Sequence, residues 1–123
     1  MAKRILIIDG HPDPADGRLC HALAAAYAEG ARAAGHDAEV LRLAGMEIPF
    51  MRSQQEFQHG ALPDSLATAA AALTAAEHVV LVFPLWLGTM PALLKAFLEQ
   101  VFRPGTAFPY QENGFLKKLL AGR

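Results

Sequence analysis

The sequence predicts an α/β protein whose parallel sheet is covered by helices on both faces. Two continuous apolar runs, residues 5–8 and 79–83, are typical of strands that are buried on both faces. A third strand is predicted at residues 38–43, between these two runs. A segment with helical periodicity follows each of the three strands. Strands that alternate with helices in this way pair in parallel through right-handed crossovers.

Length and composition limit the class of protein. The 123 residues carry a net charge of −1 and 53% hydrophobic residues, which predicts one domain over residues 1–123 without a nucleic-acid or anionic membrane partner. No apolar run is long enough to span a membrane, so we expect no membrane insertion. Because the first strand follows Met1 almost directly, we expect no signal peptide. The single cysteine, Cys20, cannot form an internal disulfide and fits a reducing, cytoplasmic compartment.

The first half of the chain is expected to form a strand, a helix and a second strand. Gly35 is a suitable C-terminal cap for the helix. In the strand at residues 38–43, Glu39 and Arg42 interrupt the apolar residues, which is typical of a sheet edge. Residues 46–60 are mixed and polar, with proline and glycine breakers, and are predicted to be mostly loop. The apolar positions of the helix recur at helical spacing: Leu19, Leu23, Ala26, Tyr27 and Gly30.

The second half is expected to place a helix on each side of the strand at residues 79–83. Asp64 or Ser65 can cap a helix that runs to about residue 76. Pro91 takes the first position of a helix that runs to about residue 102. The apolar stripes of the two helices are Leu66, Ala69, Leu73 and Ala76 in the first, and Leu93, Leu94, Phe97, Leu98, Val101 and Phe102 in the second. The second stripe is strong enough that part of it is expected to face a partner subunit.

Residues 9–20 form a loop that leads from the first strand into the N-terminus of a helix. The unpaired N–H groups and the positive dipole end of a helix favour a phosphate there. Gly17 permits close backbone approach, Arg18 can add a charge-assisted contact, and His11 can touch a phosphate or a ring system. The sequence contains neither G-x-G-x-x-G nor G-x-x-x-x-G-K-[ST], so it supports neither a dinucleotide fingerprint nor a P-loop. The alternative is that Asp16 is only a helix cap.

An aromatic, glycine-containing loop at residues 84–91 follows the last apolar strand. In open α/β sheets, ligands bind beyond the carboxyl ends of the strands, so a cofactor is expected at this loop. Trp86 alone could be an ordinary packing residue. Its place between Pro84-Leu85 and Leu87-Gly88 favours a role in a site.

These two loops together resemble those of the flavodoxin-fold NAD(P)H:quinone oxidoreductases. The resemblance rests on residues 9–14, DGHPDP, and on the loop-to-helix junction at residues 84–95, PLWLGTMPALLK. It implies a flavodoxin-like fold with strand order 2-1-3-4-5 and a bound FMN or FAD. It also implies that NAD(P)H reduces this flavin, that a quinone-like acceptor reoxidises it in ping-pong kinetics, and that homodimers form the site. FMN is favoured over FAD because no adenosine-binding feature is recognisable.

The resemblance also assigns site residues. The cofactor-binding positions it implies are His11, Gly17, Arg18, Leu19 and Cys20 in the phosphate loop, and Pro84, Leu85, Trp86 and Leu87 along the edge of the flavin ring, largely through backbone groups. Phe108 and Tyr110 are expected to wall the pocket for the two substrates.

Members of the family continue past the position of Arg123 into two further strands and a third flavin-contacting loop. We therefore expect strands in order 2-1-3, with the fourth and fifth strands missing, and a domain that is incomplete at its C-terminus. Another subunit supplying the missing strands is an alternative. Because the second half of the family fold is absent, no catalytic residue or proton donor can be named. Besides the oxidoreductase, the sequence leaves open a non-catalytic subunit of a potassium efflux system or an inactive fragment.

The cysteine and the remaining histidines are expected to have no chemical role. Cys20 is predicted to be a small buried hydrophobic residue rather than a nucleophile. Four histidines lack the spacing of metal ligands and are predicted to be surface or capping residues: His21, His36, His59 and His78. No metal is expected.

Overall fold

The computed structural model describes residues 2–103. The expectations for Phe108 and Tyr110 concern residues outside this range. Within residues 2–103, no helix is both long enough and apolar enough to cross a membrane.

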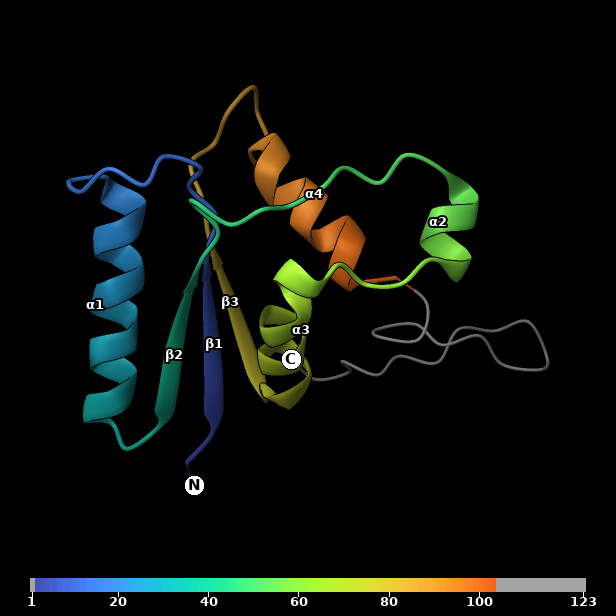
Figure 1. Ribbon diagram of the computed structural model, residues 1–123. Helices are drawn as coiled ribbons and strands as arrows, with labels where there is room; N and C mark the ends of the chain where they lie inside the picture. Colours follow the sequence, from blue (N-terminus) through green and yellow to red (C-terminus); the bar gives the residue numbers. More distant parts are fainter. Residues whose placement is uncertain (1, 104–123) are drawn as a thin grey trace.

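A parallel sheet of three strands forms the centre of the described chain (Figure 1). Strands β1 (Arg4–Asp9), β2 (Asp37–Arg42) and β3 (His78–Val82) pair in the order β2-β1-β3. Ile7 of β1 lies opposite Val40 on one side and Val80 on the other. The predicted order 2-1-3 is therefore confirmed, and its central strand is the apolar run nearest the N-terminus.

The two outer strands lie where the order 2-1-3 places them. Strand β2 lies at an edge, as its charged residues predicted. The apolar run of β3 is typical of a strand buried on both faces, but with the fourth and fifth strands missing from residues 2–103 it has a neighbour on one side only; its residues are mostly half-buried and Leu81 is 41% exposed. Within the described residues, β3 pairs with β1 on one side and has no strand on the other. Its apolar side chains are therefore less buried than those of a central strand.

One face of the sheet is covered by helix α1 (Leu19–Ala33), as Figure 1 shows. Gly35, with φ of 91°, donates to the Arg32 carbonyl, and His36 donates to the Ala31 carbonyl. These two bonds end the helix in a Schellman motif and confirm Gly35 as its terminator.

The predicted inner stripe of α1 is wrong for its large residues. Leu19, Leu23 and Tyr27 are 73%, 49% and 43% exposed, whereas the small residues of another face are buried. Both sets repeat every four residues, so spacing alone cannot choose between them. The small side chains let the helix backbone lie close to the sheet. The residues that face the sheet are Cys20, Ala24 and Ala28.

The opposite face of the sheet carries the larger core, which helices α3 (Ala67–Ala75) and α4 (Ala92–Val101) cover. Helix α3 follows a 3-10 turn, η1 (Asp64–Leu66). All of the apolar positions predicted for these two helices lie in or against this core. The large apolar side chains that are fully buried in this core are Leu6, Ile8, Leu43, Leu66, Leu73, Leu94, Phe97 and Val101.

The predicted caps of these helices need correction. Neither Asp64 nor Ser65 caps through its side chain, because Pro63 precedes η1 and the Ser65 hydroxyl donates to the Glu47 carbonyl at 2.8 Å. Pro91 is the N-cap of α4 rather than its first helical residue, with an extended ψ of 151°. Proline has no N–H to leave unpaired at a helix start, so both positions suit it.

The segment at residues 46–60 is not entirely loop, because it contains helix α2 (Gln54–His59). The Ser53 hydroxyl accepts the Glu56 N–H at 3.0 Å, and the Glu56 carboxylate accepts the Arg52 N–H at 3.1 Å. The spacing S-x-x-E is a known N-cap signature that the sequence interpretation missed. Buried Gln100 and Arg103 tie this segment to α4 by donating to the carbonyls of Pro49 and Gly60, each at 2.7 Å.

Candidate functional site

Two loops meet at the carboxyl ends of neighbouring strands. One follows β1 and leads into α1, and the other follows β3 and leads into α4 (Figure 1). The His11 ring of the first loop contacts the Trp86 ring of the second edge-on, with centroids 5.6 Å apart and an interplanar angle of 82°. The structure therefore brings together the two loops that the sequence singled out separately.

The first loop is shaped by side chains that each accept a hydrogen bond from the backbone N–H two residues further along the chain. Asp9 accepts the His11 N–H at 3.2 Å, and the His11 ring accepts the Asp13 N–H at 3.1 Å. Asp13 in turn accepts the Ala15 N–H at 2.9 Å. Short polar side chains favour turns of this kind. The result is a compact loop whose shape depends on a chain of three local acceptors.

Arg18 is held by an acidic neighbour within the same loop. Its guanidinium donates twice to one oxygen of Asp13, from Nε at 3.0 Å and from a terminal nitrogen at 2.7 Å. The Ala15 N–H and the Arg18 guanidinium together hold the pKa of Asp13 below its usual value. A phosphate at this loop would therefore share Arg18 with Asp13.

The N-terminus of α1 is open to approach. Arg18 is the N-cap residue, and no side chain caps this helix, so the alternative that Asp16 is the cap is wrong. Gly17 has φ of 86°, and a Cβ built on it would meet nothing within 4 Å. Leu19, which begins the helix, has an exposed side chain. These features fit an anion that binds backbone N–H groups at close range.

Cys20 lies beneath the loop and points into the core. Its side chain is buried. Burial is the main cause that raises the pKa of its thiol, and the negative charge of the Asp9 carboxylate raises it further. The thiol is therefore protonated at neutral pH, as expected of a structural residue. Any contact between Cys20 and a phosphate would have to come from its backbone.

His21 was predicted to be a surface or capping residue, and this prediction is wrong. Its side chain is only 10% exposed, and its ring bonds to the buried Asp9 carboxylate and to the Asp13 carbonyl. The two acidic residues are 12 and 8 positions away along the chain, so local spacing gives no hint of these contacts. The other three histidines agree with prediction: His36 is half-buried and accepts the Lys3 N–H, and His59 and His78 are exposed.

The second loop holds a tight hairpin turn. The Trp86 N–H donates to the Thr89 carbonyl at 2.8 Å, and the reverse bond measures 3.1 Å. Between them Leu87 and Gly88 have φ of 50° and 78°, the pattern of a type I′ turn. The Trp86 N–H is therefore used inside the turn, so any backbone contact from this residue to a ligand would have to come from another group.

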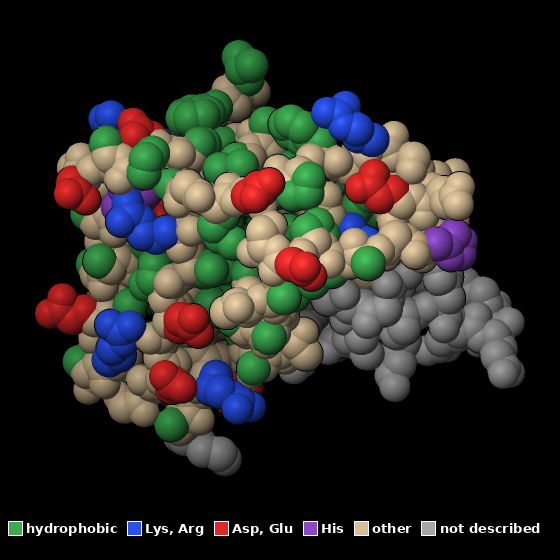
Figure 2. All heavy atoms as spheres, in the orientation of Figure 1, with side chains coloured by type: hydrophobic (Ala, Val, Ile, Leu, Met, Phe, Trp, Pro, Cys, Tyr) green, Lys and Arg blue, Asp and Glu red, His purple; other side chains and the backbone are tan. Residues whose placement is uncertain are grey.

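The side chains of this turn point to solvent. Leu85, Trp86 and Leu87 are 71%, 46% and 104% exposed, whereas Pro84 is half-buried. Figure 2 shows hydrophobic side chains protruding at the top of the molecule, where Figure 1 places the loop between β3 and α4. An apolar side chain in a left-handed, fully exposed position is unusual and is typical of a functional loop.

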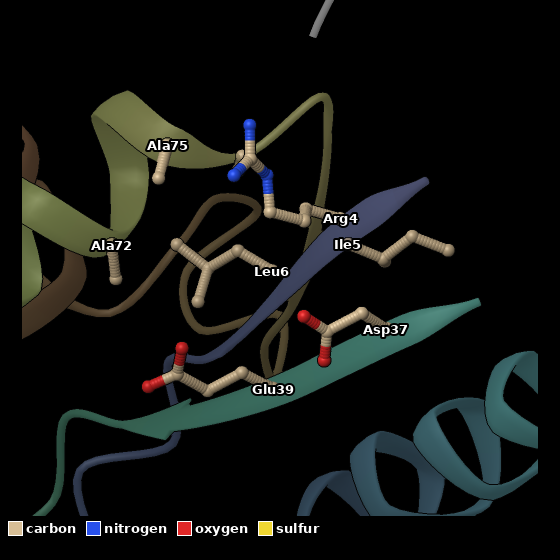
Figure 3. Close-up of a pocket in the computed structure, with 8 residues that line it drawn as sticks. Arg4, Ile5, Leu6, Asp37, Glu39, Ala72 and Ala75 are labelled. Carbon is tan, nitrogen blue, oxygen red and sulfur yellow. The ribbon is translucent and has the colours of Figure 1, made fainter. Parts of the chain in front are cut away.

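Other features of residues 2–103 lie away from the two loops, among them an open hollow of about 450 Å³ that Lys3, Tyr27, His36 and His78 help to line. No group of three or more histidine, cysteine or acidic side chains within residues 2–103 is arranged to hold a metal ion. A cavity of about 70 Å³ between the N-terminal half of β1, β2 and α3 is lined by Arg4, Asp37 and Glu39 among others (Figure 3). It lies at the end of the sheet opposite to the two loops, and it is smaller than the pockets of several hundred Å³ that hold cofactors.

Comparison with known proteins gives consistent matches. Residues 3–123 match the family model described as the flavodoxin-like fold. An FMN-dependent NADH:quinone oxidoreductase 2 from Photobacterium profundum is 30% identical over 88 residues, which are 72% of this chain and 45% of that protein. This chain thus spans about half the length of that curated relative.

Two solved structures have a similar fold. The NAD(P)H:quinone oxidoreductase from Methanothermobacter marburgensis is 26% identical with a TM-score of 0.74, and the match covers 91% of this chain and 59% of that one. An FMN-dependent NADH-azoreductase from Bacillus anthracis, solved in complex with FMN, is 19% identical with a TM-score of 0.66. It covers 98% of this chain and 65% of that one, and at this identity it shows the fold alone.

Proposed function

Because the chain belongs to the family of the flavodoxin-like fold, we propose that it binds FMN at its two loops and serves an NAD(P)H:quinone oxidoreductase reaction. The observation that carries this proposal is the contact between His11 and Trp86 at the carboxyl ends of adjacent strands. It joins the loop that leads to an uncapped helix N-terminus with an exposed aromatic turn. A phosphate and a planar ring system need these two features side by side.

The residues present fit FMN. The open space around Gly17 and the N-terminus of α1 suit the phosphate, with Leu19 and Cys20 contributing backbone N–H groups and Arg18 a positive charge. The exposed Leu85, Trp86 and Leu87, which follow Pro84, suit the edge of the flavin ring. The relatives named above that specify a flavin specify FMN, which supports FMN rather than FAD.

Bound flavin would supply the two-electron chemistry, by accepting a hydride from NAD(P)H and passing the electrons to a quinone-like acceptor with uptake of a proton. The chain's own residues bind and orient. The helix N-terminus and Arg18 hold the anionic end, and the Trp86 turn excludes water from one edge of the ring. A second copy of the chain is proposed to complete the pocket in which nicotinamide and acceptor alternate.

An FMN titration of the purified chain tests this proposal. Trp86 is the only tryptophan, so both its emission and that of the flavin report on binding at the second loop. We expect saturable quenching with a dissociation constant of about a micromolar or lower. Oxidation of NADH or NADPH by a quinone should then require added FMN and follow ping-pong kinetics. Absence of saturable quenching would contradict the proposal.

A further inference from the structure

A buried carboxylate lies directly beneath the loop after β1. Asp9 is 1% exposed, and one of its oxygens accepts the His11 N–H at 3.2 Å. Its other oxygen bonds to Nδ1 of His21. A buried carboxylate needs compensation for its lost hydration, and a negative charge at this place would repel a phosphate on the loop above. The charge of Asp9 therefore has to be cancelled for the loop to hold an anion.

The hydrogen-bond partners of His21 fix its protonation. Nε2 lies 2.7 Å from the Asp13 carbonyl oxygen, which can only accept, so Nε2 carries a hydrogen. Nδ1 faces the Asp9 carboxylate, and the pair therefore shares one further proton. Because imidazole is more basic than a carboxylate, this proton resides on the ring. His21 is then an imidazolium that donates from both nitrogens, and the pair with Asp9 has no net charge.

Other charged and titratable groups surround this pair. From β2, Arg42 has its Nε 3.9 Å from Asp9 and also donates to the Pro14 carbonyl at 3.4 Å. From the loop, the His11 ring lies 5.5 Å from the His21 ring, and the Asp13 carboxylate is paired with Arg18. From α1, the Cys20 thiol has its pKa raised by burial and by the Asp9 carboxylate. Arg42 is half-exposed and lies at the limit of an ion pair, so His21 is the principal partner of Asp9.

We propose that His21 is a positioning residue for the cofactor phosphate: it cancels the Asp9 charge under the loop and anchors the loop through the Asp13 carbonyl. This inference rests on the proposed FMN site. It predicts that phosphate affinity depends on the pairing of the two side chains. Without His21, the Asp9 carboxylate would lie uncompensated beneath the loop, so FMN binding should weaken.

Paired titrations with FMN and riboflavin isolate the phosphate, because riboflavin has the same ring without it. We expect His21→Ala to weaken FMN by about tenfold, as for loss of a hydrogen bond to a charged group, and to change riboflavin little. His59→Ala, on the exposed end of α2, is the control and should change neither. Adding Asp9→Asn to His21→Ala removes the uncompensated charge and should restore much of the FMN affinity.

Asp9→Asn alone keeps the geometry without the charges. The introduced amide nitrogen can donate to a neutral His21, while the amide oxygen still accepts the His11 N–H. FMN affinity should therefore stay close to that of the natural chain. Nitrogen NMR of the flavin-free protein near neutral pH provides a second measurement that needs no unstable variant. It should show both His21 ring nitrogens protonated in the natural chain and only one in Asp9→Asn.

The outcomes separate the two proposals. A natural chain that prefers FMN to riboflavin, together with a His21→Ala variant that keeps the same preference, would overturn the role of His21 and leave the FMN site standing. Equal weakening of FMN and riboflavin, or a His21 ring with one proton in the natural chain, would also overturn it. A natural chain that binds neither flavin would overturn the FMN site and this inference together.

Discussion

The ring of His11 meets the ring of Trp86 edge-on across the two loops, with their centroids 5.6 Å apart. This contact links the loop after β1 to the loop after β3, which are separated by more than half of the described chain. Aromatic pairs in this geometry contribute about 1 kcal/mol beyond the area they bury. The contact therefore fixes the distance between the place proposed for a phosphate and the place proposed for a ring.

Replacing Trp86 tests whether this contact supports the flavin. Trp86→Ala removes both the contact with His11 and an aromatic surface that is 46% exposed. We expect FMN affinity to fall by about fivefold or more, the equivalent of an aromatic pair. Flavin fluorescence measures the effect.

Trp86→Phe is the matched variant because it keeps an aromatic edge against His11. It should retain most of the affinity that Trp86→Ala loses. If the alanine and phenylalanine variants bind FMN as tightly as the natural chain, the ring of the flavin does not lie against this turn.

The left-handed conformation of Leu87 is expected to lower the stability of the folded protein. Its φ of 50° is left-handed, and its side chain is fully exposed, so it gains no burial in return. A left-handed residue other than glycine or asparagine costs about 1–2 kcal/mol. Leu87→Asn should therefore raise the free energy of unfolding in urea by about 1 kcal/mol, and it should weaken FMN binding because the apolar side chain is lost.

Leu85→Asn is the control for this change. Leu85 is also exposed, at 71%, but its φ is not left-handed. The same substitution there should leave stability nearly unchanged. Equal stability of the two asparagine variants would show that the conformation of Leu87 carries no strain.

The strands and the core of the α3–α4 face could be predicted because large apolar side chains recur there with a single period. Leu66, Leu73, Leu94 and Phe97 leave no second face of comparable size, so the pattern determines which side is buried. The place of the two loops followed from the sheet topology, because loops at the carboxyl ends of adjacent parallel strands must be neighbours. The strands therefore follow from local pattern, and the neighbouring placement of the two loops follows from the order of the strands.

The errors arose where local pattern is ambiguous or silent. Helix α1 has two faces with four-residue spacing, and the choice of Ala24 and Ala28 over Leu23 and Tyr27 depends on how closely the helix packs on the sheet. The pairing of His21 with Asp9 joins residues 12 positions apart through the turn of the whole loop. The one available signal was that an acid at the end of a buried strand needs a partner.

Gly17 should matter for its conformation rather than for space. Its φ of 86° suits glycine or asparagine, and no atom lies within 4 Å of a Cβ placed there. Gly17→Val should therefore distort the loop and weaken FMN binding by about tenfold, which corresponds to the free energy of the backbone strain. Gly17→Asn should bind FMN nearly as tightly as the natural chain does. Circular dichroism should show both variants folded. Equal affinities of all three proteins would place the phosphate elsewhere.

The raised pKa of the Cys20 thiol predicts how the free energy of unfolding responds to alkaline pH. Burial and the Asp9 carboxylate raise the pKa of the thiol in the folded protein above its value in the unfolded chain. Below the unfolded value the thiol is protonated in both states, and its contribution to stability is fully present. As the pH rises from the unfolded pKa towards the folded one, only the unfolded chain gains by ionising, so stability is lost.

Urea unfolding of the natural chain and Cys20→Ala at several pH values measures this contribution. The difference in free energy of unfolding between the two proteins should be constant near neutral pH and should shrink above the ordinary pKa of a thiol, about 8.5. Iodoacetamide should also alkylate Cys20 slowly in the folded protein and rapidly in urea, because the thiolate is the reactive form. Rapid alkylation of the folded protein at neutral pH, or a parallel pH dependence of the two proteins, would show that the thiol is neither buried nor affected by Asp9.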